Sequence, residues 1–158
     1  MRTLLLACFF CFSLPAHAQL PKWKITDVEN YIASSKDDVL VINFWATFCK
    51  PCIAEIPGFI RVVEKHRADS VKLLLVSLDM PSQYPNVPAF IRKHNFNAQH
   101  AWLNETDADY FCPKIDPKWS GAIPATLIVN TRTGKRLFFE EEMEEERLQE
   151  IISGMLRP

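Results

Sequence analysis

The stretch NFWATFCKPC, residues 43–52, decides the fold of this 158-residue chain. Its first three residues close a continuous apolar run, residues 39–45, in which the only polar residue is an asparagine. Such a run is typical of a strand buried on both faces of a sheet. A helical pattern starts at Lys50, with a proline in its first turn, where proline costs no hydrogen bond. The sequence therefore predicts a buried strand that leads into a helix, with Cys49 and Cys52 at the junction.

The junction gives the two cysteines different expected roles. The amides and the positive dipole at a helix N-terminus stabilise a thiolate, so we expect Cys49, exposed at the tip, to be the nucleophile. Cys52 lies one turn deeper and is placed to resolve a mixed disulfide. A lone Cys-x-x-Cys pair is also typical of half a zinc site or of a structural bridge, and Cys112 or a histidine would then be the further ligand. No second close-spaced pair follows residue 18, so the pattern favours redox chemistry.

The rest of the chain alternates strand-like and helix-like segments. Apolar runs predict strands at residues 39–45, 71–78, 101–103, 126–130 and 137–139. Helical patterns cover residues 26–34, 50–68, 87–94, 106–115 and 141–156. Thr26 and Glu29 are spaced as a capping box, and the last two strands flank a polar turn that ends in Gly134, as in a hairpin. The alternation predicts an α/β layered domain, in which the acidic run 140–146 is a solvated helix start.

The first 18 residues have the order of a secretory signal peptide. Arg2 is followed by an apolar run, residues 4–14, and by the small-x-small triplet at residues 16–18. The alternative is a membrane anchor, which needs roughly 20 apolar residues, about twice this run. We therefore expect cleavage after Ala18 and a soluble, exported, periplasmic domain of residues 19–158 in an oxidising compartment. The net charge of −1 gives no sign of a nucleic-acid partner.

Residues 43–52, together with Glu55 and Pro57, resemble the active-site segment of the thioredoxin superfamily. The resemblance is strongest to its extracytoplasmic branch, which includes the TlpA and ResA reductases and the DsbE-type cytochrome c maturation proteins. Residues 123–126 (IPAT) resemble the cis-proline loop of that family, and the similarity extends over about residues 22–156. The resemblance implies a thioredoxin-like fold with a central mixed β-sheet flanked by α-helices. It also implies an insertion around residues 80–115, between the third core element and the cis-proline loop.

The resemblance implies disulfide exchange with no cofactor beyond a redox-active Cys49–Cys52 disulfide. Lys50 and Pro51, between the cysteines, are similar to the dipeptide of reductants, and they would lie on the substrate side of the site. The implied reaction is therefore the reduction of protein or peptide disulfides. An exported reductant needs electrons, and a membrane thiol transporter is the implied donor to what we expect to be a monomer.

The cis-proline loop implies a binding surface for the substrate. Pro124 would be cis, and its backbone, with that of Ile123, would pair with an extended substrate peptide. Trp45 would pack beside the dithiol and support the same surface. From the residues alone, Pro124 is an ordinary strand-entry proline and Trp45 an ordinary core residue.

Two positions depart from the pattern of cytoplasmic thioredoxins. Asn43 stands where those proteins typically have a buried aspartate, and an amide cannot take the Cys52 proton. Glu55 follows Cys52 by three residues and so lies on the same helix face. Burial near the thiols would raise its pKa, and we expect Glu55 to be the acid–base group, the alternative being a solvated helix glutamate. Phe48 replaces a tryptophan found in many relatives.

Two other functions fit parts of the sequence. A peroxiredoxin would need the motif Pro-x-x-x-Thr-x-x-Cys, but Ile42 and Ala46 stand at those offsets from Cys49. A copper carrier could use the thiolates of Cys49 and Cys52 with a histidine or Cys112 as a further ligand. Otherwise Cys112 is expected to be a buried, idle thiol.

Overall fold

The apolar run of the active-site stretch forms the central strand of the protein. The computed structural model describes residues 19–157, so the predicted signal peptide lies outside the described residues. β2 (Val39–Trp45) has the predicted bounds, and all seven of its residues are buried. It pairs in parallel with β3 (Val71–Ser77) and antiparallel with β5 (Ala125–Asn130), which explains why its side chains are apolar on both faces.

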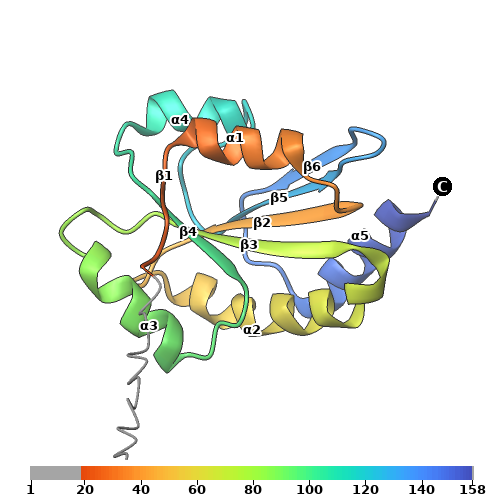
Figure 1. Ribbon diagram of the computed structural model, residues 1–158, viewed down its shortest axis with the longest axis horizontal. Coiled ribbons are helices and arrows are strands. Elements are labelled where there is room, and N and C mark those ends of the chain that lie inside the picture. The colour runs from red at the N-terminus through yellow and green to blue at the C-terminus, as the bar shows by residue number, and fades with distance from the viewer. Residues whose placement is uncertain (1–18, 158) are drawn as a thin grey trace, which may run out of the picture.

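The sheet has six strands in the order β1-β4-β3-β2-β5-β6 (Figure 1). β1 (Lys22–Trp23), β4 (Gln99–Leu103), β3 and β2 are parallel, and β6 (Arg136–Phe139) closes the predicted hairpin with β5. The mixed sheet is the one that the resemblance implied. β1 was not predicted because two residues carry no periodic pattern, and its pairing depends on hydrogen bonds to the distant β4.

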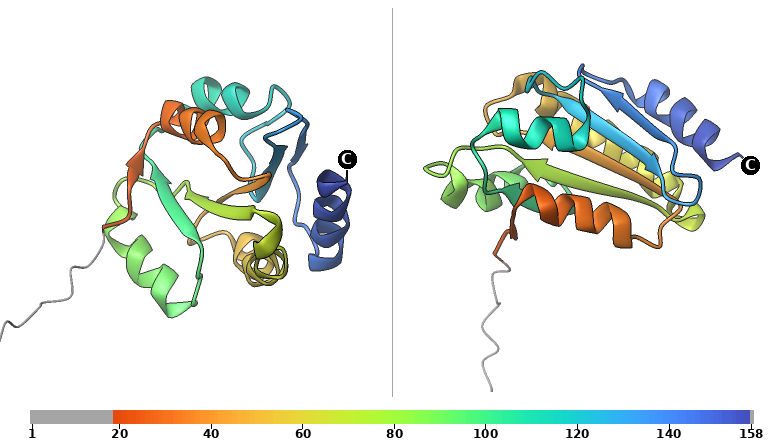
Figure 2. Two further views of the ribbon diagram at one scale, coloured as in Figure 1. Left: turned by 45° about the vertical axis from the view of Figure 1, so that its right-hand side comes forward. Right: turned by 90° about the horizontal axis from the view of Figure 1, so that it is seen from above.

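Helices cover both faces of the sheet (Figures 1 and 2). One face carries α1 (Ile25–Ser34) and α4 (Ala108–Ile115), and the other carries α2 (Lys50–Lys65), α3 (Val87–Lys93) and α5 (Glu145–Leu156). Two short 3-10 turns, Arg67–Asp69 and Tyr84–Asn86, complete the elements. The buried apolar side chains form two clusters, one on each face, and the cluster under α2 contains both Cys49 and Cys52. The expected insertion, residues 80–115, supplies α3, β4 and α4.

The predicted capping box of Thr26 and Glu29 is wrong. α1 begins earlier, at Ile25, and its first turn is held by Asp27, whose carboxylate accepts from the Lys24 N–H at 2.7 Å. Ile25 has no exposed surface. Burial of the Ile25 side chain therefore places Ile25 in the first turn of the helix, since tertiary packing outweighs a weak local signal such as the spacing of Thr26 and Glu29.

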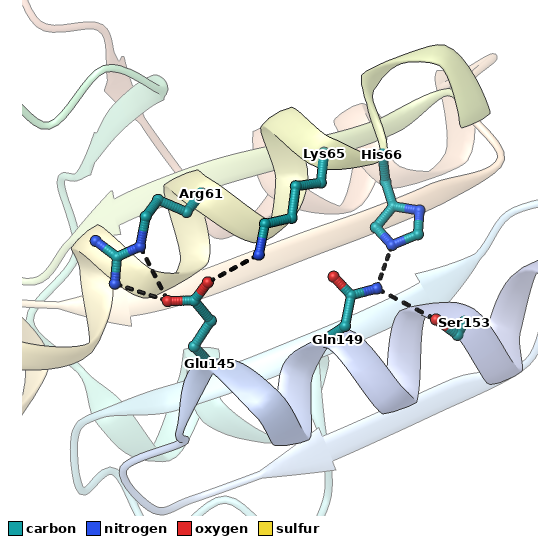
Figure 3. Close-up of polar contacts among 6 residues, drawn as sticks. All are labelled: Arg61, Lys65, His66, Glu145, Gln149 and Ser153. Carbon is teal, nitrogen blue, oxygen red and sulfur yellow. Dashed lines mark hydrogen bonds and ion pairs between the residues drawn. The ribbon is translucent and has the colours of Figure 1, made fainter.

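The final helix begins at Glu145 rather than at the predicted residue 141, and it docks on α2. The Glu145 carboxylate accepts from Arg61 at 2.7 Å and from Lys65 at 3.2 Å, and Gln149 contacts His66 further along (Figure 3). The acidic run is therefore only partly a helix start. Its first part forms a connecting segment, because Met143 within it is buried in the core. No helix within residues 19–157 is both long and apolar enough to cross a membrane.

Candidate active site

The two cysteines of the motif are joined as a disulfide at the start of α2. Cys49 is the N-cap residue of the helix, and its Sγ accepts from the backbone N–H of Cys52 at 3.3 Å. One helix amide thus points at the first sulfur, in line with the position expected from the strand-to-helix junction. The contact is the one that would stabilise a thiolate on Cys49 after reduction.

The exposure of the pair differs from the prediction for Cys49. Cys52 is fully buried, as expected, but Cys49 exposes only 7% of its surface rather than standing free at the tip. Its sulfur is turned onto the helix end by the disulfide and by the contact with the Cys52 amide. The neighbouring Phe48 is 61% exposed. Cys49 is still the only residue of the pair with any exposed surface.

The turn before Cys49 is held by a buried aspartate that the sequence analysis missed. Asp79 follows the end of β3, and its carboxylate accepts from the Thr47 N–H at 3.1 Å and from the Ser77 hydroxyl at 2.8 Å. The Thr47 hydroxyl also donates to it. Asp79 is 2% exposed. Its position after a predicted strand could have indicated this role, since polar residues at the carboxyl ends of parallel strands gather at one edge of a sheet.

Trp45 lies in the core cluster that contains both cysteines. Its ring packs edge-on against Phe96 at 5.6 Å between centroids and lies 6.0 Å from Phe90. It has no exposed surface, so it does not contact a substrate directly.

Glu55 is buried, which contradicts the alternative of a solvated helix glutamate. It exposes 5% of its surface, and its two oxygens accept from Asn43 Nδ2 and from the Met143 N–H, each at 2.8 Å. Burial raises the pKa of Glu55 to about 7, opposed by these two hydrogen bonds and assisted by the charge of Glu142. The carboxyl group can therefore exchange a proton near neutral pH.

The Ile123–Pro124 peptide bond is cis, the geometry that the resemblance implied. The loop before it is fixed by Glu140, whose carboxylate accepts from the Ser120 N–H at 3.1 Å and from the Ala122 N–H at 2.9 Å. Slight burial opposes ionisation, but these hydrogen bonds outweigh it and hold the pKa of Glu140 below its usual value. Glu140 was not predicted to have this role, because its partners lie about 20 residues earlier in the chain.

A groove of about 300 Å³ runs from the active-site turn to the cis-proline loop. Phe48 and Met80 line it and are 61% and 54% exposed, and Ile123 of the cis-proline loop lines it as well. Lys50 and Pro51 are exposed at the start of α2. Exposed apolar side chains gathered in one hollow are typical of a site that binds another molecule.

A family model matches residues 12–134, most of the chain, and its description is the AhpC/TSA family. The chain belongs to the AhpC/TSA family. Among relatives of this AhpC/TSA-family chain, the thiol-disulfide oxidoreductase ResA of Bacillus thuringiensis (strain Al Hakam) is 30% identical over 142 residues, which cover 88% of this chain and 75% of the relative. Over that span the chain is, like ResA, a thiol-disulfide oxidoreductase.

Two further comparisons concern a short segment of the sequence and the fold. Sporulation thiol-disulfide oxidoreductase A of Bacillus subtilis (strain 168) is 34% identical over 55 residues, which cover 35% of this chain but only 33% of the relative. The crystal structure of a thioredoxin-related protein from Neisseria meningitidis serogroup B superposes with a TM-score of 0.67 at 22% identity, covering 77% of this chain and 87% of the other. The structural match confirms the thioredoxin-like fold.

Within residues 19–157, the one cysteine outside the disulfide is a buried free thiol. Cys112, on α4, is 3% exposed and lies beneath the loop before the cis-proline, where a Cβ added at Gly121 would be 3.8 Å from its sulfur. Burial, with smaller effects of nearby carboxylates, raises the pKa of its thiol to about 11. At neutral pH it is therefore protonated and unreactive.

The copper-carrier alternative requires a third ligand next to the cysteine pair. Within residues 19–157, no three histidine, cysteine or acidic side chains are grouped so that they could hold a metal ion. Cys112 lies in the cluster on the opposite face of the sheet from Cys49 and Cys52. The described part of the chain thus offers no such ligand set.

Proposed function

We propose that this protein reduces disulfides in other proteins or peptides, with Cys49 as the attacking and Cys52 as the resolving thiol. The Cys49 thiolate attacks one sulfur of the substrate disulfide, forms a mixed disulfide and releases the other substrate sulfur as a thiol. Cys52 then attacks Cys49, which restores the Cys49–Cys52 disulfide and frees the second substrate thiol. The observation that carries this assignment is the contact between the Cys52 amide and Cys49 Sγ, with Cys52 itself fully buried.

Glu55 is proposed to take the Cys52 proton. It follows Cys52 by three residues on the same face of α2, and its pKa of about 7 lets it accept a proton at neutral pH and return it. Asn43 cannot fill this role, because an amide does not titrate.

We propose that the substrate lies extended along the groove. The backbone of Ile123 and Pro124 would pair with it, and the exposed side chains of Phe48 and Met80 would contact its apolar residues. Lys50 and Pro51 would border the same surface from the start of α2. Trp45 would support the dithiol from the core.

The proposed direction is reductive. Two buried carboxyl groups lie close to the dithiol segment: Asp79 accepts from the active-site turn at Thr47, and Glu55 is a residue of α2. Negative charge disfavours a thiolate and so favours the disulfide form of the protein, which is the property of a reductant. A membrane thiol transporter would supply electrons to an exported, periplasmic, monomeric domain. Apocytochrome c belongs among the substrates to be tested, given the resemblance to the DsbE-type proteins.

Trapping with a disulfide-containing peptide tests the roles of the cysteines. Cys52→Ser is expected to accumulate a mixed disulfide through Cys49, visible by mass spectrometry, and the matched Cys49→Ser variant is not. If the mixed disulfide accumulates in neither variant, the proposal is contradicted. Hydrogen peroxide turnover that survives Cys52→Ser would instead favour a peroxidase, and stoichiometric copper in the reduced protein would favour a carrier.

Equilibration against glutathione buffers tests the direction. We expect the Cys49–Cys52 couple to have a reduction potential well below that of a strong oxidant. A value near about −120 mV would identify the protein as an oxidant instead.

A further inference from the structure

The Glu55 carboxyl group belongs to a hydrogen-bond network that joins four separate segments of the chain. Asn43 of β2 donates from Nδ2 to Glu55 Oε1 at 2.8 Å and to Thr126 Oγ1, on β5, at 3.0 Å. The backbone N–H of Met143, just before α5, donates to Glu55 Oε2 at 2.8 Å. Asn43 and Thr126 have no exposed surface, and Glu55 has 5%. Each oxygen of the carboxyl group therefore faces an N–H donor in a closed site.

This arrangement suits only the ionised form of Glu55. A protonated carboxyl group carries an O–H donor, which needs an acceptor, whereas both of its neighbours present donors. The Met143 N–H belongs to the main chain, two residues before Glu145, which is fixed to Arg61 and Lys65 (Figure 3). The Asn43 amide is held by no such anchor, and a half-turn of its terminal torsion exchanges its oxygen and nitrogen.

The unused atom of Asn43 is the acceptor that the acid needs. Asn43 Oδ1 is buried without a hydrogen-bond partner within the described residues. After a half-turn, Oδ1 occupies the present place of Nδ2 and accepts from the Glu55 O–H. The Thr126 hydroxyl, which can both donate and accept, reverses and donates to the same oxygen.

We propose that Asn43 is a positioning residue that serves both ionisation states of Glu55, donating to the carboxylate and turning over to accept from the carboxylic acid. The inference deepens the proposed role of Glu55 and takes its functional meaning from that role. An aspartate at position 43 has no donor for the carboxylate, so the amide is the group that fits both states. Thr126 lies two residues after Pro124, so the change also reaches the strand that follows the cis-proline loop.

Glu55 is the group that titrates near neutrality in this part of the protein. Burial raises its pKa to about 7, and the charge of Glu142, from the segment before α5, adds to the effect. The disulfide does not titrate, and β2 and β5 face Glu55 with the neutral side chains of Asn43 and Thr126. Arg61 and Lys65 of α2 are paired with Glu145.

The oxidised protein, specifically labelled at asparagine and glutamate side chains, provides the test by NMR. We expect the cross-peaks between the Asn43 amide protons and Thr126 to weaken as pH falls, with the same midpoint as the Glu55 carboxyl carbon. In Glu55→Gln, which cannot titrate, the cross-peaks are expected to be independent of pH. Cross-peaks in the wild-type protein that persist while Glu55 becomes protonated would overturn the proposal.

A charge substitution provides a second, independent measurement. Asn43→Asp removes the donor and adds a second carboxyl group, so the Glu55 midpoint is expected to rise by at least about one pH unit. The exposed Asn97→Asp adds the same charge elsewhere and is expected to leave the midpoint unchanged. An unchanged midpoint in folded Asn43→Asp would contradict the contact. Neither measurement involves thiols, so loss of the catalytic role of Glu55 would be seen separately, in the pH profile of disulfide exchange.

Discussion

Two buried carboxyl groups, Glu55 and Asp79, show how single residues set the chemistry of this site. Each is nearly closed to solvent, and each is satisfied by hydrogen bonds instead of by a cation. Asp79 fixes the turn that precedes Cys49, whereas Glu55 lies in a buried site that raises its pKa. Burying a charge without an opposite charge beside it is costly, so both carboxyl groups lower the stability of the folded protein.

The cost of burying Glu55 predicts a pH-dependent stability. Burial raises its folded-state pKa from 4.5 to about 7, so between these values the folded protein binds more protons than the unfolded chain. Stability is therefore full below about pH 4.5 and is lost as pH rises through 7, by about 3 kcal/mol from this group. Urea unfolding of the oxidised protein at pH 4.5 and pH 8 measures the loss. Glu55→Gln should lose about 3 kcal/mol less over the interval, and equal losses would refute the assignment.

At the scale of elements, the site depends on two loops that are anchored from outside. The loop before the cis-proline is held by Glu140, and the segment before α5 is held through Glu145 on α2. Both loops contribute to the site through their backbones, at Pro124 and at Met143. Substituting side chains of the Cys-x-x-Cys motif would not reveal these backbone contributions.

A pair of glycines separates loop strain from loop function. Gly121, before the cis-proline, has φ +95°, and Gly134, in the β5–β6 turn, has φ +73°. Replacing either with alanine should cost about 1–2 kcal/mol, because L-residues disfavour this backbone region. Only Gly121→Ala is expected to slow disulfide exchange, measured with a peptide substrate. Equal rates in the two variants would show that the loop does not contact the substrate.

A second pair of glycines tests the contact between α2 and α5. A Cβ added at Gly58 would lie 3.3 Å from the Cβ of Glu145, whereas one at Gly154 would meet nothing within 4 Å. Gly58→Val is expected to lower the free energy of unfolding by about 1–3 kcal/mol through overpacking. Gly154→Val should change it by less than about 0.5 kcal/mol. Similar values from urea unfolding would mean that the helices adjust freely.

At the scale of the whole molecule, local patterns predicted the elements, and contacts between distant segments completed the site. The bounds of β2 match the prediction because all seven residues are buried and all but Asn43 are apolar. The resemblance supplied the mixed sheet and the cis-proline, which periodicity alone does not specify. The partners of Asp79, Glu140 and Met143 could not be predicted, since they lie 32, 18 and 88 residues away in sequence.

The proposed direction of electron flow predicts which form of the molecule is more stable. In a reductant the folded state favours the disulfide over the dithiol more strongly than the unfolded chain does. The oxidised protein should therefore be more stable to urea than the reduced protein. A folded-state potential about 30–60 mV below that of the unfolded dithiol corresponds to roughly 1.4–3 kcal/mol. Unfolding of both forms under argon measures the difference. Greater stability of the reduced form would indicate an oxidant.

The amide of Met143 joins Glu55 from 88 residues further along the chain. Chains are made from the N-terminus, so the cysteine pair and the first two helices leave the ribosome well before this amide exists. Until the last segment docks, the carboxyl group lacks one of its two partners and has the acidity of a more hydrated side chain. A nascent chain would thus carry its sulfurs and Glu55 before the buried site around Glu55 is complete, and competence for exchange would be the final property acquired in biogenesis.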